Sequence, residues 1–462
     1  MRLNIKYWLG GIIAILVILL AGMYIHQKNH FNKNTTINNV AVGGLTAKQA
    51  YDKVSKQSQT TKVYVNHDLV YQAQQPTKEH FTSSDEAKFT KALSEQFTFF
   101  PSHKAVNVAV KPSNFDNRSL DPARTAVTKK INQLNVGRKA PVDAYAVYKK
   151  DKVSVVPAVN GTKYNLQKAL KQVDNQAGNG TIKVTPHYQK PLAADSNTVK
   201  NEQKQLEKLT GKSVTYQVEN EKYHFTSAQI ITKATYKDGK YNFVTTGLDN
   251  EVKKINKKQG TLGKAFKFKT HAGNEITTAA GGSYGWKISN TKAANTLTQA
   301  ILKGKSDVNG AQDIYGTGYN TGGTGYNVTA NDGIGNTYAE VSLADQHAWF
   351  YKDGKCVLST DIVSGTNNEG NRTPKGVWYI MYQQTPSVLR GQNDDGSPYA
   401  SKVNYWSPFT DTGCGFHDAS WRHNWSKTAY LSDGSHGCIN MHPSVAGQAF
   451  HYLQKNEPVI IY

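Results

Sequence analysis

The 462-residue chain is poor in cysteine, in acidic residues and in long apolar runs. Its three cysteines, Cys356, Cys414 and Cys438, all lie in the last quarter of the sequence. Exported domains that rely on disulfides carry cysteines in even numbers and at high density, so a disulfide-stabilised scaffold is excluded. At least one thiol therefore has no intrachain disulfide partner, and an unpaired thiol in an exported chain indicates a reactive or catalytic role.

A single stretch is apolar and long enough to cross a bilayer. After two basic residues the chain runs uncharged from Tyr7 to Ile25, which is about 28 Å as a helix and close to the hydrocarbon thickness. The sequence "AGMYIHQ" that ends this run has no clean small-x-small cleavage site. We therefore predict an uncleaved anchor with a cytoplasmic tip over residues 1–29, and a cleavable signal peptide is the alternative. Because no second apolar run follows, residues 30–462 are predicted to lie outside the cytoplasm.

The few acidic residues are unevenly distributed. Residues 336–462 hold 9 basic and 11 acidic residues, which leaves 46 basic and 23 acidic ones in residues 1–335. The net charge of +21 therefore belongs to the N-terminal part, which is expected to attract polyanions. Since the predicted anchor separates the chain from nucleic acid, cell-wall polyanions or anionic lipids are the predicted partners. A solvated basic surface without any partner is the alternative.

The basic part is predicted to contain two α+β units. Segments 63–73 and 214–225 alternate apolar and polar residues around a short turn, which predicts β-hairpins. Segments 159–170 and 281–301 each place a glycine turn and an aromatic residue before a helical pattern. These pairs fit a diverged duplication and fit two unrelated units equally well. The predicted boundaries are 30–190, 191–315 and, for a glycine-rich linker, 316–335.

After the linker the pattern changes to that of strands. Segments 338–351, 355–365 and 376–382 read as strands, and "KDG" between the first two predicts a hairpin turn. Pro443 opens a short helix, and "PVIIY" closes the chain as a buried strand. Residues 336–462 are therefore predicted to form a mostly β, sandwich-like domain with a short helix late in the chain.

The stretch "GSHGCIN", residues 434–440, sets one cysteine in a frame of glycines. A cysteine becomes a nucleophile when an imidazole or backbone N–H groups stabilise its thiolate. Gly434 and Gly437 allow backbone conformations that other residues adopt only under strain, so the turn can aim successive N–H groups at one point. Cys438 is the candidate nucleophile, and the N–H groups of His436, Gly437 and Cys438 are candidate oxyanion donors.

A nucleophilic thiol needs a general base, and four histidines are available. His417 lies 21 residues upstream of Cys438. His423 stands among polar residues and is expected to be exposed, while His442 directly precedes the predicted helix and could cap it. His436 is the nearest in sequence. Spacing alone favours His417 and leaves the choice open.

The motif "FHDASWR" followed by "GSHGCIN" resembles the signature of the L,D-transpeptidase family, the YkuD-type catalytic domain of bacterial cell-wall enzymes. The resemblance covers about residues 336–462: "GNTYAEVSLADQHAWFYKDGKCVLSTDIVSG" is similar to the family's opening strands and "RTPKGVWYI" to its Thr-Pro-x-Gly strand. Upstream, "GGSYGWKISNTKAANTLTQAI" resembles the peptidoglycan-binding type of domain that often precedes this catalytic domain in Gram-positive bacteria. The two α+β units are thus expected to be stalk domains of that type.

The resemblance implies roles for individual residues. The family's nucleophile falls on Cys438 and its general base on His417. Ser435, His436 and Gly437 match the loop that shapes the oxyanion site, and Asp418 is implied as an orienter of the imidazole, a role that a backbone carbonyl often takes in the family. For substrate contact the resemblance implies Asn440, where many members have arginine. Arg422 and Arg390 are the alternative ligands of a substrate carboxylate. Trp421, Trp406 and Tyr399 either line the substrate groove or belong to the core.

The family's activity supplies the implied function. Cys438 would form an acyl-enzyme with a tetrapeptide stem, release D-Ala and form a 3→3 cross-link in peptidoglycan, or act as an L,D-carboxypeptidase if water is the acceptor. No cofactor is implied. A zinc site is a rival, disfavoured because the histidines lack zinc-ligand spacing, and a wall-binding protein without catalysis is another. Cys414 is expected to be a buried thiol, and a disulfide that would inactivate Cys438 is the alternative.

Overall fold

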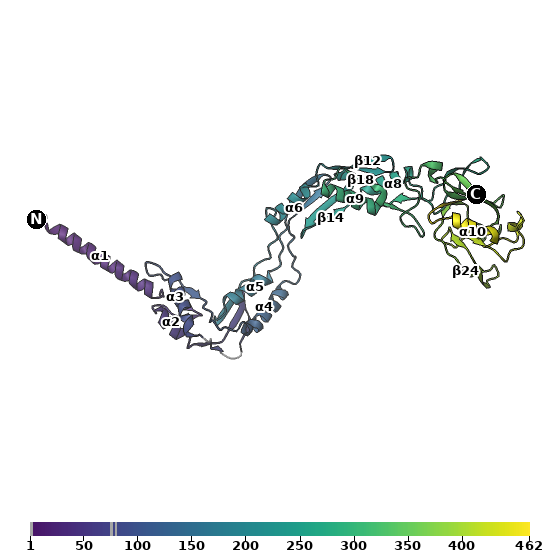
Figure 1. Ribbon diagram of the computed structural model, residues 1–462. Helices are drawn as coiled ribbons and strands as arrows, with labels where there is room; N and C mark the ends of the chain where they lie inside the picture. The colour runs from purple at the N-terminus through teal and green to yellow at the C-terminus, as the bar shows by residue number, and fades with distance from the viewer. Residues whose placement is uncertain (1–2, 74–76, 79–80) are drawn as a thin grey trace. The chain divides into compact units, whose positions relative to one another are not determined.

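The structure is a computed structural model that describes residues 3–73, 77–78 and 81–462 (Figure 1). The chain divides into two compact units. Unit 1 comprises Met1–Ala144 and Pro157–Ser196, and unit 2 comprises Tyr145–Val156 and Asn197–Tyr462. The first two residues of the predicted anchor lie outside the described part of the chain.

Unit 1 begins with the apolar helix α1 (Leu3–Asn29). Its segment Trp8–Asn29 has a mean hydropathy of 2.4 and is long and apolar enough to cross a membrane. The end of the helix belongs to the fold that follows, because Gln27 is buried and its Nε2 donates to Asn32 Oδ1 at 3.1 Å. The predicted N-terminal apolar helix is therefore confirmed.

Two small α+β cores make up the rest of unit 1. In the first, α2 and α3 cover a three-stranded sheet of order β2-β1-β7 around Ile37 and Phe89. In the second, α4 and α5 pack on a sheet of order β10-β4-β5 around Val127 and Ile182. The elements are β1 (Thr35–Ile37), β2 (Val40–Ala41), α2 (Ala47–Val54), β3 (Ser58–Gln59), β4 (Lys62–Val65), β5 (Asp68–Gln72), β6 (Thr77–Lys78), α3 (Glu86–Glu95), β7 (Val106–Val108), α4 (Asp121–Leu134), α5 (Leu166–Asn175) and β10 (Thr181–Val184).

The first part of unit 2 is a third α+β core. It holds one sheet of order β14-β13-β8-β9 and a second of order β12-β11-β18. The sheets and the helices share one core, in which Trp286 and Tyr216 are fully buried. The elements are β8 (Tyr145–Lys149), β9 (Lys152–Val156), α6 (Asn197–Glu207), β11 (Ser213–Val218), β12 (Glu221–Thr226), α7 (Ser227–Ile230), β13 (Lys233–Lys237), β14 (Lys240–Val244), α8 (Leu248–Lys258), β15 (Lys267–Lys269), β16 (Glu275–Thr277), β17 (Lys287–Ile288), α9 (Asn290–Lys303), β18 (Asp307–Asn309) and β19 (Ile314–Tyr315).

The compact units divide between Ser196 and Asn197, and one earlier hairpin, Tyr145–Val156, also belongs to unit 2. Strands β8 and β9 come from the middle of the predicted first domain, but β8 pairs with β13 in unit 2. Ala146 N in β8 also donates to the buried carboxylate of Glu202 at 2.9 Å. The pairing of β8 with β13 joins segments more than 80 residues apart, so local sequence patterns do not show which unit the β8–β9 hairpin joins.

Residues 316–335 are held in place by hydrogen bonds on both sides. The hydroxyl of Tyr379 donates to Thr317 O at 2.6 Å and accepts from Asn320 N at 2.8 Å. At the other side, Gly285 N donates to Thr324 Oγ1 at 2.8 Å. The glycine-rich segment is thus a fixed connection within unit 2.

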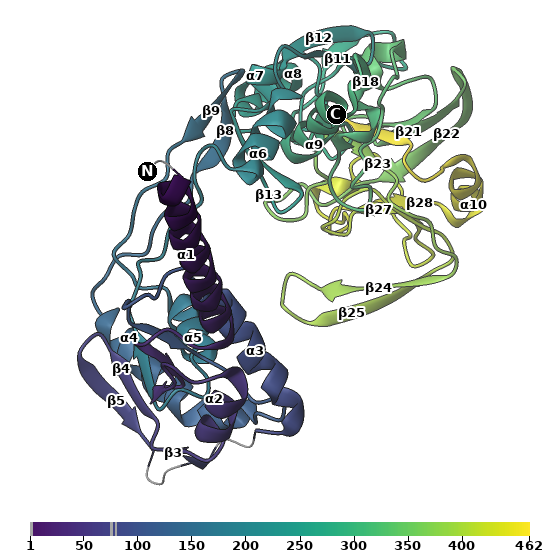
Figure 2. The ribbon, with the colours of Figure 1, turned by 90° about the vertical axis from the view of Figure 1, so that its left-hand side faces the viewer.

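The C-terminal part of unit 2 is built on one curled, half-barrel sheet of order β23-β29-β20-β21-β22-β28-β27-β26 (Figure 2). The last strand of the chain, β29, lies between β23 and β20 and runs parallel to β20. Helix α10 packs against β27, β22 and β21. The elements are β20 (Tyr338–Ser342), β21 (His347–Lys352), β22 (Lys355–Val363), β23 (Gly376–Tyr379), β24 (Ser387–Gln392), β25 (Pro398–Val403), β26 (Trp406–Pro408), β27 (Gly415–Asp418), β28 (Ile439–Met441), α10 (Pro443–Tyr452) and β29 (Pro458–Ile461).

The predicted mostly β domain with a late helix is confirmed. Its core is built from the inward faces of β20 to β22, β27 and β28 together with α10, including Phe350, Phe416 and Ile439. Strands β24 and β25 form a separate two-stranded hairpin, which projects away from the curled sheet (Figure 2).

Candidate active site

Strands β27 and β28 bring the two halves of the predicted signature side by side. They pair in parallel, with His417 opposite Asn440. Side chains two positions apart in an extended chain point to the same face. Cys438 directly precedes β28, so it lies on the same face as Asn440 and the His417 ring, and all three line one cleft. The sheet thus unites residues that are 21 positions apart in the sequence.

The His417 imidazole is buried, and both of its ring nitrogens have partners. Nδ1 lies 2.9 Å from the backbone oxygen of Asp418, and Nε2 lies 3.1 Å from Nδ2 of Asn440. A carbonyl oxygen can only accept, so Nδ1 carries the proton and Nε2 presents its lone pair. Burial lowers the pKa of His417 below its ordinary value, because it disfavours the charged imidazolium.

The Asp418 carboxylate does not orient the imidazole. Adjacent residues of a strand face opposite sides of the sheet, and the Asp418 side chain is turned to the β25–β26 connection. Its Oδ1 accepts from Asn404 N at 2.8 Å and Tyr405 N at 2.9 Å, and its Oδ2 accepts from Asn404 Nδ2 at 3.0 Å. The prediction of a contact through the carboxylate is therefore corrected: Asp418 holds His417 through its backbone carbonyl.

Arg422 fixes the orientation of Asn440. Arg422 Nε donates to Asn440 Oδ1 at 3.0 Å, so the amide oxygen faces the guanidinium and the amide nitrogen faces His417. The side chain of Arg422 is only 6% exposed, and its Nη1 is also paired with the Asp433 carboxylate at 3.2 Å. Both residues were predicted to contact substrate. Both line the cleft, and they also form a chain of contacts that ends on the imidazole.

The turn before Cys438 is held by hydroxyl groups. Gly437 has φ +110°, a conformation that favours glycine, and a Cβ there would lie 2.7 Å from Cys414 Sγ. Ser435 Oγ accepts from Gly437 N at 3.0 Å and donates to Cys438 O at 2.6 Å. Because the Gly437 N–H is taken, the N–H groups of His436 and Cys438 are the candidate oxyanion donors that this loop retains.

Thr373 is a residue of this site that sequence reasoning missed. Its hydroxyl donates to Gly437 O at 2.8 Å and accepts from Gly365 N at 2.9 Å. The hydroxyl thereby ties the cysteine turn to the backbone of Gly365. The signal was present in "RTPKGVWYI", where the threonine stands before a proline, but sequence alone does not show what its hydroxyl touches.

Cys438 is partly exposed at the cleft, and its thiol donates to Gly413 O at 3.5 Å. Burial and the neighbouring Cys414 raise the pKa of the Cys438 thiol to about 12. Cys414 is a buried free thiol, and burial raises its pKa as well. Cys356 is a free cysteine on the exposed side of β22.

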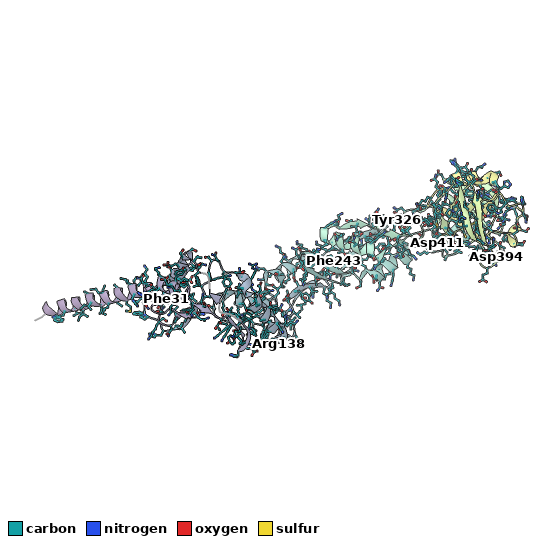
Figure 3. The ribbon with its side chains drawn as sticks, turned by 90° about the horizontal axis from the view of Figure 1, so that it is seen from below. Phe31, Arg138, Phe243, Tyr326, Asp394 and Asp411 are labelled. Carbon is teal, nitrogen blue, oxygen red and sulfur yellow. The ribbon has the colours of Figure 1, made fainter. Side chains whose placement is uncertain are left out.

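The cleft has a volume of about 700 Å³ and is bounded on one side by the β24–β25 hairpin. Tyr399 of β25 stacks on the ring of His436 with centroids 5.4 Å apart. Asp394, at the hairpin tip (Figure 3), accepts from Asn371 Nδ2 at 2.8 Å. The lining residues are Leu389, Arg390, Gly391, Asn393, Tyr399, Ser401, Thr412, Gly413, His417, Trp421, Arg422, His423, Asn424, Asp433, Gly434, Ser435, His436, Cys438 and Asn440.

The two tryptophans predicted for the groove differ in position. Trp421 is 45% exposed, stacks on His417 with centroids 5.8 Å apart and lines the cleft. Trp406 lies opposite His417 in β26, is buried and is not among the lining residues. It fills the space over Gly415, where a Cβ would lie 2.6 Å from its ring. Trp406 therefore supports the sheet from the core.

The competing histidines lie apart from the imidazole of His417. His442 caps α10, because its side chain accepts from Ser444 N. His423 is exposed at the rim of the cleft, and His436 faces the hairpin. Within the described part of the chain, no group of three or more His, Cys, Asp or Glu side chains is placed to hold a metal ion.

Residues 336–461 match the YkuD family, described as the L,D-transpeptidase catalytic domain. Among solved structures, the chain is 34% identical to Ldtfm in its avibactam carbamoyl enzyme, with 56% of this chain and 96% of that chain covered and a TM-score of 0.43. It is 33% identical to a mutant of the Enterococcus faecium L,D-transpeptidase, over 56% of this chain and 98% of that one, with a TM-score of 0.43. The comparison with curated proteins found no match.

The catalytic domain of the E. faecium L,D-transpeptidase is 46% identical, with 28% of this chain and 97% of that domain covered and a TM-score of 0.26. The matches thus include almost the whole length of a relative with one third of its residues identical, together with the family's catalytic domain. Members of the family are cysteine enzymes of the bacterial cell wall that act on peptidoglycan stem peptides. The chain belongs to the L,D-transpeptidase family.

Proposed function

We propose that the protein is a peptidoglycan L,D-transpeptidase in which Cys438 is the nucleophile and His417 is the general base and acid. The observation that carries this proposal is the parallel register of β27 and β28, which gathers His417, Asn440 and Cys438 in one cleft. The family's stem-peptide substrates agree with a thiol that attacks an amide carbonyl.

The thiol and the imidazole are proposed to be neutral before the reaction. The raised pKa of Cys438 and the lowered pKa of His417 both oppose a preformed thiolate–imidazolium pair, because burial disfavours each charged form. The proton is therefore expected to move from Sγ to Nε2 during the attack. For this transfer, Nε2 exchanges its hydrogen bond with Asn440 for one with the thiol.

The proposed reaction has two acyl transfers. Sγ forms a bond to the carbonyl carbon of the third residue of a tetrapeptide stem, the C–N bond to D-Ala breaks, and the leaving nitrogen takes the proton from His417. An amine of a second stem then attacks the thioester, which forms the 3→3 cross-link and returns a proton to Sγ through His417. The N–H groups of Cys438 and His436 are the donors proposed for the oxyanion.

Arg390 is proposed as the residue that receives a substrate carboxylate. It stands on β24 and lines the cleft. Arg422, the other candidate for this carboxylate, is already hydrogen-bonded to Asn440 and ion-paired with Asp433. Tyr399 and Trp421 are proposed to line the path of the stem peptide, because both border the same cleft.

The protein is proposed to be held in the cell membrane by α1, with the catalytic domain on the wall side. The last turn of the helix is built into unit 1, since Gln27 is buried and Tyr24 packs edge-on against Phe97 with centroids 5.7 Å apart. Cleavage at or after these residues would remove part of a folded core. The basic N-terminal part is proposed to meet teichoic acids or anionic lipids, as its excess of lysine suggests.

The proposal is tested with the full-length protein in neutral detergent, incubated with disaccharide-tetrapeptides and followed by mass spectrometry. A dimer that lacks one D-Ala is expected, and Cys438→Ala should give none. A tripeptide alone would identify an L,D-carboxypeptidase, in which water takes the acyl group. If a carbapenem adds no acyl mass to the native chain, the protein is a non-catalytic wall-binding member and the proposal fails.

A further inference from the structure

Unit 1 contains a basic groove that the proposed catalysis does not use. It has a volume of about 570 Å³ and lies between helix α5 and the segment that follows strand β10. It is lined by Lys168, Lys171, Gln172, Asn175, His187, Tyr188 and Lys190.

One wall of the groove is a face of α5. Lys168, Lys171 and Asn175 follow one another at helical spacing and share this face. Gln172, on the same face, fixes the helix to the chain beyond β10: its Nε2 donates to Thr185 O and its Oε1 accepts from Thr185 N, both at 2.9 Å. The lysines therefore project from a wall whose position is fixed by the fold.

The second wall contains an aromatic stack. Tyr188 is 52% exposed and lies on Tyr164 with centroids 5.0 Å apart and ring planes 9° from parallel. The guanidinium of Arg138 lies over Tyr164 at 4.4 Å (Arg138 is labelled in Figure 3). Arg138 Nε in turn donates to Leu134 O at 2.6 Å. Tyr188 thus offers the groove a flat apolar face that is supported from behind.

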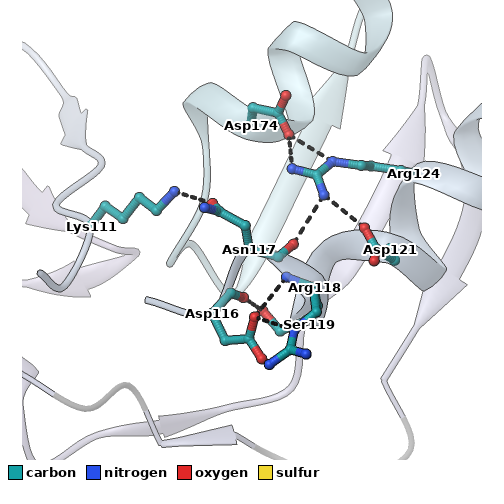
Figure 4. Close-up of polar contacts among 8 residues, drawn as sticks. All are labelled: Lys111, Asp116, Asn117, Arg118, Ser119, Asp121, Arg124 and Asp174. Carbon is teal, nitrogen blue, oxygen red and sulfur yellow. Dashed lines mark hydrogen bonds and ion pairs between the residues drawn. The ribbon is translucent and has the colours of Figure 1, made fainter. Parts of the chain in front are cut away.

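The positive charge of the groove is not neutralised by its surroundings. None of its lining residues is acidic. Asp174, on the same helix, is turned to α4, where its Oδ1 accepts from Arg124 Nε at 2.9 Å and from Arg124 Nη2 at 2.7 Å (Figure 4). Within the described part of the chain, no ion pair involves Lys168, Lys171 or Lys190. Three ammonium groups therefore face one concavity without a counter-charge.

We propose that this groove binds a polymer of phosphodiester-linked small polyols, the chemistry of a teichoic acid. Lysine binds phosphate as a point charge, without the fixed fork geometry that arginine brings to carboxylates and phosphates alike, so a row of lysines suits a flexible chain of phosphodiesters. The exposed face of Tyr188 suits the C–H groups of a polyol. A bilayer surface fits less well, because the site is concave and its one exposed aromatic ring, Tyr188, is stacked on Tyr164. The exposed phenylalanines of unit 1, Phe97, Phe99 and Phe100, do not line the groove.

This inference deepens the proposed contact between the basic part and the cell envelope, and its test does not depend on catalysis. Full-length protein in neutral detergent is titrated with fluorescent poly(glycerol phosphate) at several salt concentrations, with anisotropy as the readout. The groove variant replaces Lys168, Lys171 and Lys190 by glutamine. The matched control replaces three exposed lysines outside the groove, Lys56, Lys104 and Lys129, by glutamine.

The groove variant is expected to bind on the order of tenfold more weakly at low salt, and the slope of log K against log salt should fall by about 2, roughly 0.7 for each lost phosphate contact. The control should change less than about twofold, since screened charges away from the site contribute little. Tyr188→Ala should weaken binding without changing the slope. Cys438→Ala should bind like the native chain, which separates this proposal from the catalytic one.

Equal losses in the two lysine variants would overturn the proposal, because they would mean attraction by net charge alone. If poly-glutamate binds more tightly than poly(glycerol phosphate), the groove is a site for carboxylates. If a single-stranded oligonucleotide binds more tightly than poly(glycerol phosphate), the groove is a site for nucleic acid. Binding to phosphatidylglycerol vesicles that is lost in the groove variant, with no binding of the free polymer, would assign it to the membrane. Each of these three results rejects the polyol phosphate.

Discussion

Asn440 connects Arg422 and His417, which look like separate candidate site residues in the sequence. Arg422 holds its amide oxygen, and its amide nitrogen faces the lone pair of His417 Nε2. The arrangement positions the base and fixes its tautomer, because Nδ1–H is directed to the Asp418 carbonyl. Asn440 and Arg422 are therefore positioning residues in the proposed mechanism.

Replacement of Asn440 tests this role. Asn440→Ala should lower kcat about tenfold with little change in KM, because the imidazole loses a partner that orients it. Asn440→Asp should move the acid limb of the pH profile of kcat upward, because a carboxylate beside the imidazole favours its charged form. Steady-state rates with stem tetrapeptide between pH 5 and 8 provide both readouts. An unchanged kcat and pH profile in both variants would contradict the role.

The raised pKa of Cys438 predicts how its alkylation depends on pH. With a pKa of about 12, the thiolate fraction rises about tenfold per pH unit through pH 7 to 10, because only the thiolate reacts. Peptide-resolved mass spectrometry after short exposure to iodoacetamide should show this rise without a plateau. In urea the same cysteine should level off above about pH 9, since its pKa returns to about 8.5. A plateau below pH 9 in the folded protein would indicate a preformed thiolate.

Gly437→Ala should abolish acylation by a carbapenem, a loss of at least about a hundredfold. The new Cβ would meet Cys414 Sγ at 2.7 Å in a backbone with φ +110°, so the turn that carries Cys438 must shift. Gly354→Ala is the matched control, because its φ is +79° and nothing lies within 4 Å of the added Cβ. That variant should acylate normally. Normal acylation of Gly437→Ala would show that the turn tolerates a side chain.

Sequence could identify these residues but not what they touch. The signature motifs indicate His417 and Cys438 because their residue types and glycine frame carry chemical meaning. The direction of the Asp418 carboxylate and the relay through Asn440 depend on the pairing of β27 with β28, which is a tertiary contact. The same holds for Trp406, whose burial over Gly415 follows from its place in β26.

At the scale of elements, alternation and turn chemistry predicted the regular hairpins well. The segments 63–73 and 214–225 fold as β4–β5 and β11–β12, and "KDG" forms the turn between β21 and β22. The β24–β25 hairpin at the cleft was missed, because its sequence, "SVLRGQNDDGSPYASKV", is polar and has no core-facing periodicity. An element with little buried surface leaves no hydrophobic pattern to read.

The segment 316–335 gives a prediction at this scale. Tyr379→Phe removes two hydrogen bonds, to Thr317 O and from Asn320 N, which should loosen the segment by about 1–3 kcal/mol. Hydrogen exchange measured by mass spectrometry should show peptides from this segment exchanging about tenfold faster or more. Tyr382→Phe is the control, because its hydroxyl has only a 3.4 Å contact with Trp406 Nε1. Equal protection in both variants would show that other contacts hold the segment.

At the scale of the whole molecule, hydropathy and periodicity predicted the two ends of the chain, and the domain boundaries between them stay a prediction. The apolar N-terminal helix and the mostly β C-terminal domain follow from composition and periodicity over long windows. The division into compact units does not follow from composition, because β8 and β9 belong to a sheet that also contains the later strands β13 and β14. Composition averages over neighbours in sequence, whereas a compact unit is defined by neighbours in space.

The fate of α1 is the prediction that belongs to the whole chain. The helix end is part of a folded core through Gln27 and Phe31, both nearly inaccessible to solvent, and the run before it has no small-x-small site. Intact-mass measurement of protein from bacterial membranes should therefore give all 462 residues. Met23→Ala is the matched test, because it gives the sequence AGA at residues 21–23. That variant should be cleaved and appear, shortened, in the medium. A native chain that is already shortened at this place would mean that α1 is a signal peptide and that unit 1 folds with only residues 24–29 of the helix.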